Sequence, residues 1–364
     1  MELYTQKDAC CGCGACADAC DQNAIRMVRD REGFSYPEVD REACVSCGRC
    51  RRVCPLPRRG PEVREHLYFG ARAKEETLRL ASSSGGVFPL LARYVFARGG
   101  VVYGAAYDRD MAVVHREARD EEELEGLKRT KYVQSRLDGV YRRVEAHLRE
   151  GRWVLFCGTP CQVQALRRFL GRPYPTLLLA DLICYGVPSP GVWERYVRHL
   201  QKARGGRLTG FSFRDKRNRD NGHTCAYTVG ETEYAGPLNS DPYCRLFFRN
   251  LIIRPSCHAC PYCAPERDSD LTIGDFWGVE KVRPEMDDGM GTSLVILHTP
   301  QGRAAWEAVR DQLDWFQCRR EDALQPRLTG PTPAGRGREA FMRCYRLLPF
   351  SHLLRLSGGK KFRK

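Results

Sequence analysis

Residues 10–20 read CCGCGACADAC, and residues 44–54 read CVSCGRCRRVC. Both segments carry four cysteines at matching positions, with two residues between each of the first three and three residues before the fourth, and the first segment has Cys11 in addition. The second copy begins 34 positions after the first (44 − 10) and is followed by Pro55. This internal repeat predicts that residues 1–58 form one small domain, with short strands over 24–28 and 34–39 around a turn.

Four thiolates must converge to hold a cubane cluster, and in two-cluster ferredoxins the fourth cysteine of each run ligates the other cluster. The repeat therefore predicts two [4Fe–4S] sites, one formed by Cys10, Cys13, Cys16 and Cys54, the other by Cys44, Cys47, Cys50 and Cys20. Zinc is the alternative, but zinc sites usually use pairs of close cysteines, and disulfides are a further one. Asp21 stands where the ferredoxin pattern has proline, and Cys11, which has no place in the pattern, is interpreted as a bystander.

The composition sets limits on the class of protein. The chain has 364 residues, 19 cysteines and a formal net charge of +14. Its length suggests two domains, or three. The most apolar stretch, residues 176–184, contains Asp181 and is too short to cross a bilayer, and the N-terminus shows no signal peptide pattern. We expect a cytoplasmic protein, in which many cysteines indicate metal or redox chemistry.

The prolines after residue 54 predict a linker over 59–66, followed by a larger domain over 67–364. Apolar patterns in that domain alternate between strands and helices. Strands are expected at 67–73, 101–107, 112–115, 153–156, 176–183, 270–274 and 294–298. Helices are expected at 87–97, 137–150, 160–170, 190–204 and 301–313. The fold class predicted is α+β or α/β, a ferredoxin-like domain followed by a larger mixed domain.

A second set of cysteines lies in the larger domain. Cys257, Cys260 and Cys263 are spaced by two residues, while Cys161 and Cys184 follow apolar strands. Because ligands gather at the carboxyl ends of strands in open α/β sheets, Cys161 and Cys184 are well placed to complete a site with Cys257 and Cys260. The alternative is that these cysteines are buried and inert.

Two polar segments are candidates for binding a ligand. Residues 82–86 read SSSGG at a helix start, where glycine lets the backbone approach a ligand and free N–H groups favour a phosphate. A simple helix cap explains the segment equally well. Residues 128–135 read KRTKYVQS, which is either a binding loop or a solvated basic loop.

Taken together, the motifs of the larger domain resemble the β subunits of coenzyme F420-reducing hydrogenases and related formate dehydrogenases. The segments that carry the resemblance are 83–86 (SSGG), 131–135 (KYVQS), 157–162 (CGTPCQ), 184–189 (CYGVPS), 257–260, 270–278 (DLTIGDFWG) and 291–293 (GTS). The attached two-cluster domain differs from the hydrogenase subunits. It is similar to ferredoxin-coupled members of the family, such as reductases of chlorophyll precursors and members associated with polysaccharide genes.

The resemblance implies an iron–sulfur flavoprotein that binds FAD and passes a hydride to or from coenzyme F420 or a similar organic acceptor. It implies a third [4Fe–4S] cluster held by Cys161, Cys184, Cys257 and Cys260, with Cys157 and Cys263 as substitutes. It also implies a set of flavin contacts, namely Ser84, Gly85, Gly86, Lys131, Tyr132, Ser135, Gly158 and Thr159. No catalytic residue is assigned, although His223, Asp275 and Trp277 lie near these motifs in the sequence.

Three other interpretations stay open. The chain is expected to bind a protein partner, such as ferredoxin or a hydrogenase or dehydrogenase subunit, and a small-molecule substrate. A homo-oligomer is also considered. It could instead be an electron-transfer subunit with no substrate of its own, or a ferredoxin-dependent reductase of another molecule. Basic stretches at 204–207 and 214–219 raise nucleic acid binding, but no nucleic-acid-binding motif accompanies them, and no such partner is predicted.

Overall fold

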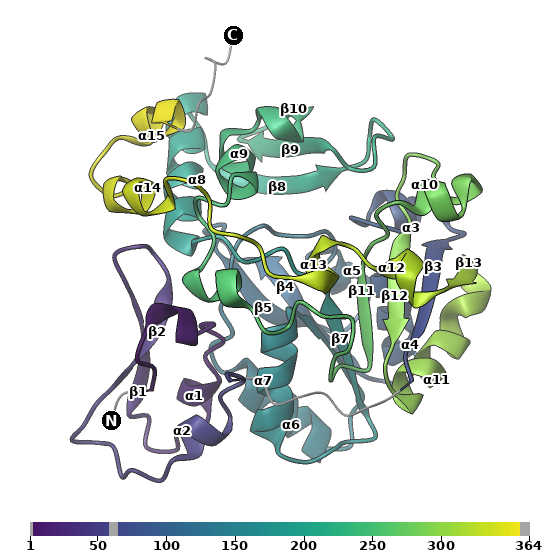
Figure 1. Cartoon of the computed structure of the whole chain (residues 1–364), viewed down its shortest axis with the longest axis horizontal. Coiled ribbons are helices and arrows are strands. Elements are labelled where there is room, and N and C mark those ends of the chain that lie inside the picture. The colour runs from purple at the N-terminus through teal and green to yellow at the C-terminus, as the bar shows by residue number, and fades with distance from the viewer. Residues whose placement is uncertain (1–2, 58–64, 357–364) are drawn as a thin grey trace.

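The computed structural model describes residues 3–57 and 65–356 (Figure 1). The N-terminal module contains an antiparallel hairpin of β1 (Ile25–Arg29) and β2 (Ser35–Val39), as the repeat predicted. Two one-turn helices, α1 (Ala15–Asp18) and α2 (Arg49–Arg52), occupy matching places in the two copies. Each begins after a left-handed glycine, Gly14 (φ 79°) or Gly48 (φ 72°), which admits this backbone at no steric cost. The 3-10 turn η1 (Lys7–Ala9) precedes them.

In the described part of the larger domain, eight strands form one mixed sheet in the order β13-β3-β12-β11-β7-β6-β4-β5. The inner pairs β4·β6, β6·β7 and β7·β11 are parallel, and the outer pairs are antiparallel. The strands are β3 (Leu67–Ala73), β4 (Val101–Tyr107), β5 (Val113–Ala118), β6 (Val154–Gly158), β7 (Leu177–Leu182), β11 (Leu271–Asp275), β12 (Ser293–Leu297) and β13 (Leu313–Cys318).

Helices cover both faces of this sheet, so its central strands are mostly apolar on both faces, with Asp181 of β7 and Thr272 of β11 as buried polar exceptions. On one face, α4 (Val87–Phe96) and α11 (Pro300–Val309) pack on Val102, Leu155 and Leu178. On the other face, α6 (Val140–Arg149) and α7 (Pro160–Leu170) pack on Val101, Val154 and Leu177. Adjacent residues of each strand point to opposite faces, which explains why both sets are apolar.

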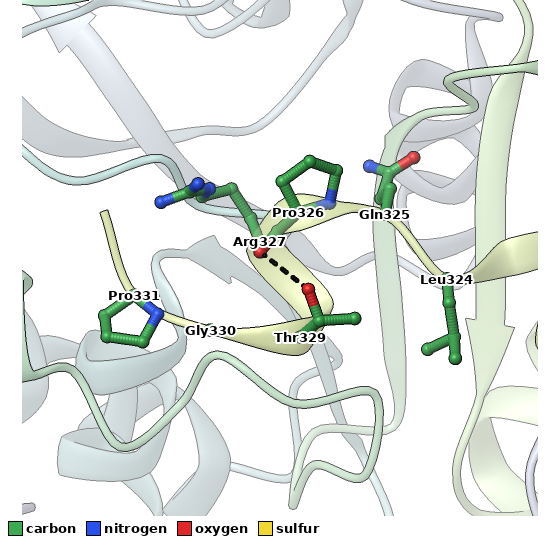
Figure 2. Close-up of a pocket in the computed structure, with 7 residues that line it drawn as sticks. All are labelled: Leu324, Gln325, Pro326, Arg327, Thr329, Gly330 and Pro331. Atoms are coloured by element: carbon green, nitrogen blue, oxygen red, sulfur yellow. Dashed lines mark hydrogen bonds between the residues drawn. The ribbon is translucent and has the colours of Figure 1, made fainter. Parts of the chain in front are cut away.

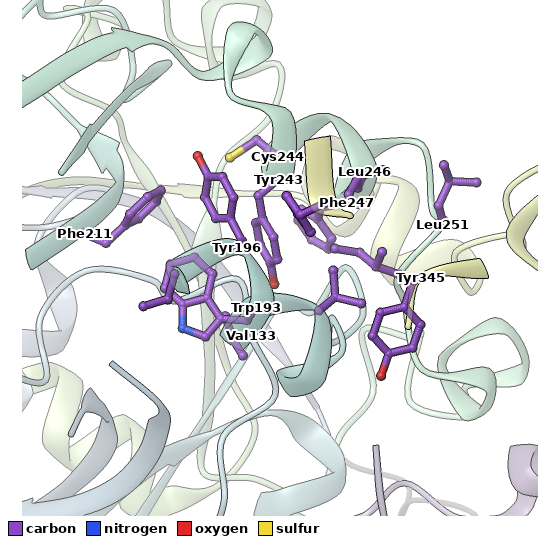
Figure 3. Packing of buried hydrophobic residues seen from close by; sticks show 14 of the residues in the cluster. Val133, Trp193, Tyr196, Phe211, Tyr243, Cys244, Leu246, Phe247, Leu251 and Tyr345 are labelled. Atoms are coloured by element: carbon purple, nitrogen blue, oxygen red, sulfur yellow. The ribbon is translucent and has the colours of Figure 1, made fainter. Parts of the chain in front are cut away.

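A smaller antiparallel sheet, β10-β9-β8, packs against α8 and α9 around an aromatic core (Figure 3). Trp193, Tyr196, Phe211 and Tyr243 lie at its centre, with ring centroids 5.1 to 6.1 Å apart in the pairs that touch. Its elements are α8 (Pro190–Arg204), β8 (Leu208–Asp215), β9 (Thr224–Val229), β10 (Thr232–Pro237), α9 (Pro242–Phe248), α14 (Arg338–Cys344) and α15 (Phe350–Leu356).

Short elements connect these layers. They are α3 (Glu76–Leu80), α5 (Glu121–Glu125), η2 (Leu238–Ser240), η3 (Pro255–Ala259), α10 (Val279–Val282), η4 (Pro284–Met286), η5 (Arg310–Gln312), α12 (Arg320–Ala323) and α13 (Pro326–Thr329).

The ferredoxin-like module, purple in Figure 1, lies beside α6 and α7. The carboxylate of Asp18 accepts hydrogen bonds from the backbone N–H groups of Gly139 (2.9 Å) and Tyr141 (3.1 Å), at the start of α6. The Tyr141 hydroxyl donates to the carbonyl oxygen of Cys13 at 3.1 Å. The module is thus joined to the larger domain next to its own cysteine loop.

The mixed α/β fold agrees with the class predicted from the pattern, and α7 and α8 begin and end where the sequence placed them. Two helices are clearly shorter than predicted. The run expected over 137–150 forms α6 only from Val140 to Arg149, and the run expected over 301–313 leaves the α-helix at Val309, after which Leu313 begins β13. Leu313 is buried against the core, so packing in the sheet outweighs its helical preference. The predicted linker 59–66 lies largely outside the described residues, as does the C-terminal tail.

Candidate functional site: three groups of cysteines

The first group joins the two copies of the repeat. Burial, and then the nearby charges of Cys10 and Cys54, raise the pKa of Cys16 to about 12. Cys13 lies near Cys16 and Cys54 in turn. The structure therefore brings Cys54, from the second copy, to the three cysteines of the first copy. This is the exchange of the fourth cysteine that the repeat predicts.

The second group surrounds a cavity of about 130 Å³. Its lining includes Cys20 together with Cys44, Cys47 and Cys50. Cys50 is buried, whereas Cys47 is exposed at the surface of the module. The four cysteines expected to share one site thus lie around one small space, at the edge of the protein.

The third group lies at the carboxyl edge of the large sheet. Cys161 is in the first turn of α7, after β6, and Cys184 comes two residues after β7. Burial, and then the charges of Cys257, Cys161 and Cys260, raise the pKa of the Cys184 thiol well above its ordinary value. Burial likewise raises the pKa of Cys257 to about 12. The parallel strands β6 and β7 end together, which brings Cys161 near Cys184, and η3 brings Cys257 to the same group from 73 positions (257 − 184) further along the chain.

The two substitutes proposed for this group behave differently. Cys263 lies within hydrogen-bonding range of Cys260 and near Cys184. Cys157 lies on β6 near Asp181 and Lys131, and burial raises its pKa to about 12. Cys263 therefore lies beside the four cysteines of the third group, whereas Cys157 lies beside Asp181 and Lys131 instead.

These thiols suit a positively charged metal centre. Thiolates are the metal-binding form of cysteine, yet burial and mutual repulsion hold these groups protonated in the bare protein. Iron or zinc would remove that penalty by accepting the sulfur lone pairs. An all-sulfur donor set, with three cysteines spaced by two residues in each copy of the repeat, fits iron–sulfur clusters.

The SSGG segment is partly explained by packing. The Gly85 amide donates to the Ser293 hydroxyl at 2.9 Å, and a Cβ at Gly85 would lie 2.2 Å from the Ala71 carbonyl oxygen. Gly86, with φ 87°, precedes the first residue of α4, as expected for a helix start. The Ser84 hydroxyl donates to the Thr292 carbonyl oxygen at 3.1 Å. The glycines are therefore required by the fold whether or not a ligand binds here.

The other flavin candidates form two clusters. Ser135 accepts a hydrogen bond from Gln162 (3.0 Å) and lies 2.9 Å from Nδ1 of His115, and Gln162 also completes the helix cap at Thr159, next to Gly158. Tyr132 packs against Phe213, Phe247 and Phe248. Lys131 donates to the Gly126 and Lys128 carbonyl oxygens, and burial lowers its pKa to about 7.

One hydrogen bond links the SSGG segment to the basic loop, since the Thr130 amide donates to the Ser83 hydroxyl at 2.8 Å. Lys216, which is buried, donates from Nζ to the carbonyl oxygens of Arg79 and Ser84. Arg214 pairs with Asp275 at 2.7 Å and lies near Tyr132. Sequence reasoning missed Arg79, and it noted Arg214 and Lys216 only within the basic stretch 214–219, because none of the three belongs to the motifs of the resemblance.

Of the three residues left without a role, only Asp275 lies in this network. His223 sits in an exposed turn, where Nδ1 is 2.6 Å from the Asp220 carbonyl oxygen. Trp277 is 53% exposed, and its amide donates to the Gln325 side chain at 3.1 Å. Gln325 also lines an open surface cavity of about 480 Å³ formed by residues 324–327 and 329–331 (Figure 2).

A further cysteine pair lies in the aromatic core. Ligand atoms of Cys225, Asp241 and Cys244 lie within 4.8 Å of one another, and all three residues are buried (Cys244 is drawn in Figure 3). Asp241 already accepts hydrogen bonds from the Cys244 amide (2.9 Å) and the Tyr196 hydroxyl. It caps α9, which gives the carboxylate a structural role.

Comparison with known proteins identifies two segments. Residues 9–56 match the model of the 4Fe-4S dicluster domain, and residues 151–315 match that of the coenzyme F420 hydrogenase/dehydrogenase beta subunit, C terminus. A chain in a xenon-derivatised F420-reducing [NiFe] hydrogenase complex from Methanosarcina barkeri is similar in structure. It shares 19% identity at a TM-score of 0.47, over 73% of this chain and 84% of that one. No curated protein matches the chain.

The family matches confirm the resemblance that the motifs predicted. Residues 9–56 match a 4Fe-4S dicluster domain, which supports iron–sulfur clusters in this module, and residues 151–315 of the larger domain are related to the C-terminal part of the F420 hydrogenase/dehydrogenase β subunits. Within the described residues, no helix has the length and apolarity needed to span a membrane.

Proposed function

We propose that the chain is an iron–sulfur flavoprotein oxidoreductase that relays electrons between the ferredoxin-type clusters and FAD. In this proposal a hydride then passes to or from coenzyme F420 or a similar organic acceptor. The observation that supports it best is the arrangement of the three cysteine groups. The second group lies at the protein surface, and the first group is more deeply buried. The third group lies at the carboxyl edge of the large sheet.

The second group is the proposed entry point for electrons. Cys47 is exposed beside Val45, which is 65% exposed, and the Arg52 guanidinium donates to the Cys47 carbonyl oxygen at 3.1 Å. An exposed arginine beside a redox centre attracts an acidic protein and orients it during encounter. The partner proposed is thus an acidic electron carrier such as a ferredoxin, or a hydrogenase or dehydrogenase subunit.

The first and third groups adjoin each other. The thiol of Cys11 is within hydrogen-bonding range of Cys13, a member of the first group, and of Cys161, a member of the third. Cys11, interpreted from the sequence as a bystander, therefore lies between two of the proposed clusters. This contact supports a path from the dicluster module into the larger domain.

The proposed flavin site is the region where the SSGG segment meets the basic loop. Arg79, Arg214 and Lys216 lie near one another there, and burial, then Arg214, lowers the pKa of Lys216 to about 7. Arg79 and Arg214 already pair with Asp288 (2.5 Å) and Asp275 (2.7 Å), so Lys216 is the cation of this group that an anionic ligand, such as the pyrophosphate of FAD, would contact and keep protonated. FAD, when bound, supplies the exchange between one- and two-electron steps. The chain's own residues would orient it and exclude water.

The acceptor is proposed to bind beside Trp277, at the open cavity of residues 324–331 (Figure 2). Arg327, in this segment, lies 5.2 Å from the centre of the Tyr185 ring, and Tyr185 follows Cys184 directly. An exposed indole and an arginine suit a planar, anionic molecule, such as a deazaflavin with a phosphate-bearing tail.

The test is to reduce the purified protein without oxygen and to monitor the reduction by the flavin absorbance. Reduced ferredoxin and reduced coenzyme F420 are added separately. The proposal predicts that both bleach the flavin, the first through the clusters and the second directly. If neither reagent bleaches a bound flavin, the relay is wrong.

The attached dicluster domain favours a second candidate, a ferredoxin-dependent reductase of another small molecule. In that case reduced ferredoxin bleaches the flavin and coenzyme F420 does not. A chain that accepts electrons from ferredoxin but contains no flavin would instead be an electron-transfer subunit of a larger complex.

A further inference from the structure

Arg254 is an arginine in the protein interior whose side chain has 0% exposure. It precedes η3 and reaches back into the dicluster module. Its Nε donates to the Cys10 carbonyl oxygen at 2.8 Å, its Nη1 to the Gln134 side chain at 3.0 Å, and its Nη2 to the Ser35 carbonyl oxygen at 3.1 Å. Its Nη2 also lies 3.7 Å from the Cys10 sulfur. The guanidinium is thus hydrogen-bonded to a residue of the first cysteine group.

The same residue is bonded to the third group through its backbone. The Cys257 amide donates to the Arg254 carbonyl oxygen at 3.0 Å. Arg254 therefore touches Cys10 with its side chain and Cys257 with its main chain. Together with Cys11, which contacts Cys161, it connects the first and third groups at two places.

The partners of Arg254 are unusual for a buried arginine. Among the described residues they are two carbonyl oxygens, an amide oxygen and a sulfur, with no carboxylate. Other buried arginines of the chain pair with acids: Arg267 with Asp181 at 2.9 Å, and Arg338 with Glu32 at 2.7 Å. An uncompensated buried cation is costly. Thiolates bound to a cluster would supply the missing negative charge.

The surrounding residues are shaped to admit the guanidinium. A Cβ at Gly12 would lie 2.6 Å from Nη1 and 2.7 Å from Cζ of Arg254, and Gly12 has φ +66°. The guanidinium also lies over the Tyr36 ring, 4.2 Å from its centre. Gly12 is in the cysteine loop itself, so the loop and the arginine fit each other closely.

We propose that Arg254 is a positioning residue that fixes the first cluster against the third and raises the reduction potential of the first cluster. This rests on the proposed relay. A cation beside a [4Fe–4S] centre stabilises its reduced, more negative form, because net charge and hydrogen bonds to sulfur set the potential. One electron leaves the first cluster and one enters the third. Arg254 keeps its proton throughout, and no covalent bond forms or breaks.

The test is a potentiometric titration of the anaerobic full-length protein, followed by electron paramagnetic resonance. In Arg254→Gln, the ratio of reduced to oxidised first cluster at a fixed potential should fall at least tenfold. That fold-change equals about 59 mV for a one-electron couple. Arg254→Lys should recover part of the shift. The control is Arg338→Gln, which removes a buried arginine from the same interface without touching a cysteine.

The proposal is overturned if Arg254→Gln keeps its full iron content and its ratio of reduced to oxidised first cluster stays within twofold of wild type. If that variant does not fold, Gln134→Glu serves instead, because it sets a carboxylate against Arg254 without changing the size of the side chain. It should shift the potential in the same direction, and an unchanged potential there would also overturn the proposal. The titration needs neither flavin nor substrate. It therefore tests the role of Arg254 even if the protein fails to transfer a hydride, and the two failures can be told apart.

Discussion

Gly33 of the dicluster module and Gly191 of α8 meet through their backbones. The Gly191 amide donates to the Gly33 carbonyl oxygen at 3.3 Å, and a Cβ on either residue would lie 2.7 Å from the Cα of the other. The Ser189 hydroxyl donates to the Glu32 carbonyl oxygen at 2.6 Å, directly beside this contact. The module therefore packs closely on the larger domain, as the proposed electron path between them requires.

Gly191→Ala should separate these surfaces and destabilise the protein by about 1 to 3 kcal/mol, the usual range for an overpacked contact. Anaerobic urea unfolding measures the effect. Gly236→Ala is the control, because a Cβ there meets no atom within 4 Å. Equal stability of the two variants would show that the backbone contact is not required.

The third cysteine group gives a prediction about iron content. Cys257→Ala should remove about four irons per chain, since the proposed third cluster would lose one of its thiolates. Cys157→Ala should keep them, because Cys157 lies near Asp181 and Lys131 instead. Iron and sulfide are measured after anaerobic purification. Loss of iron in Cys157→Ala alone would reverse the assignment.

Lys216 predicts a dependence of stability on pH. Burial lowers its pKa to about 7, so between pH 7 and its ordinary value of 10.5 the unfolded chain carries a proton that the folded chain lacks. Raising the pH through this window therefore stabilises the fold. From pH 7 to 9, wild type should gain about 2 kcal/mol more than Lys216→Met, at 1.36 kcal/mol per unit.

The measurement is the free energy of urea unfolding at the two pH values, taken without oxygen. Comparing the variant with wild type cancels the contributions of other titrating groups. Parallel pH dependence in the two proteins would contradict the prediction.

The exposed second group predicts how an electron donor associates. Arg52→Glu reverses a charge beside Cys47, so reduction by an acidic ferredoxin should slow about tenfold at low salt. The difference should shrink as the ionic strength rises. The control is Arg310→Glu, directly after α11, because Figure 1 shows α11 and α2 on opposite sides of the molecule. Equal slowing in both variants would mean that the carrier does not dock at the second group.

The sequence was most informative where spacing and chemistry agree. The repeat predicted that Cys54 joins the cysteines of the first copy, because the cluster pattern requires it, and the structure brings them together. Apolar strands predicted that Cys161 and Cys184 meet at one sheet edge, since parallel strands end on the same side. Both predictions rest on rules that hold irrespective of the rest of the chain.

Other features depend on contacts that no local pattern contains. Arg254 reaches Cys10 across 244 positions, so its role beside the first group could not be read from its neighbours in sequence. The small sheet was also missed, and its edge strand β10 contains no buried residue that would mark it as a strand. Gly85 and Gly86 stay predicted flavin contacts, and the close approach of the Ala71 carbonyl oxygen gives Gly85 a packing role that the sequence did not indicate.

The measurement that tests the central claim most directly is the iron, sulfide and flavin content of protein purified without oxygen. Three clusters and one flavin predict about twelve irons, about twelve sulfides and about one FAD per chain. About eight irons with no flavin would contradict the relay. It would leave a dicluster module attached to a domain whose cysteines at the sheet edge hold no cluster.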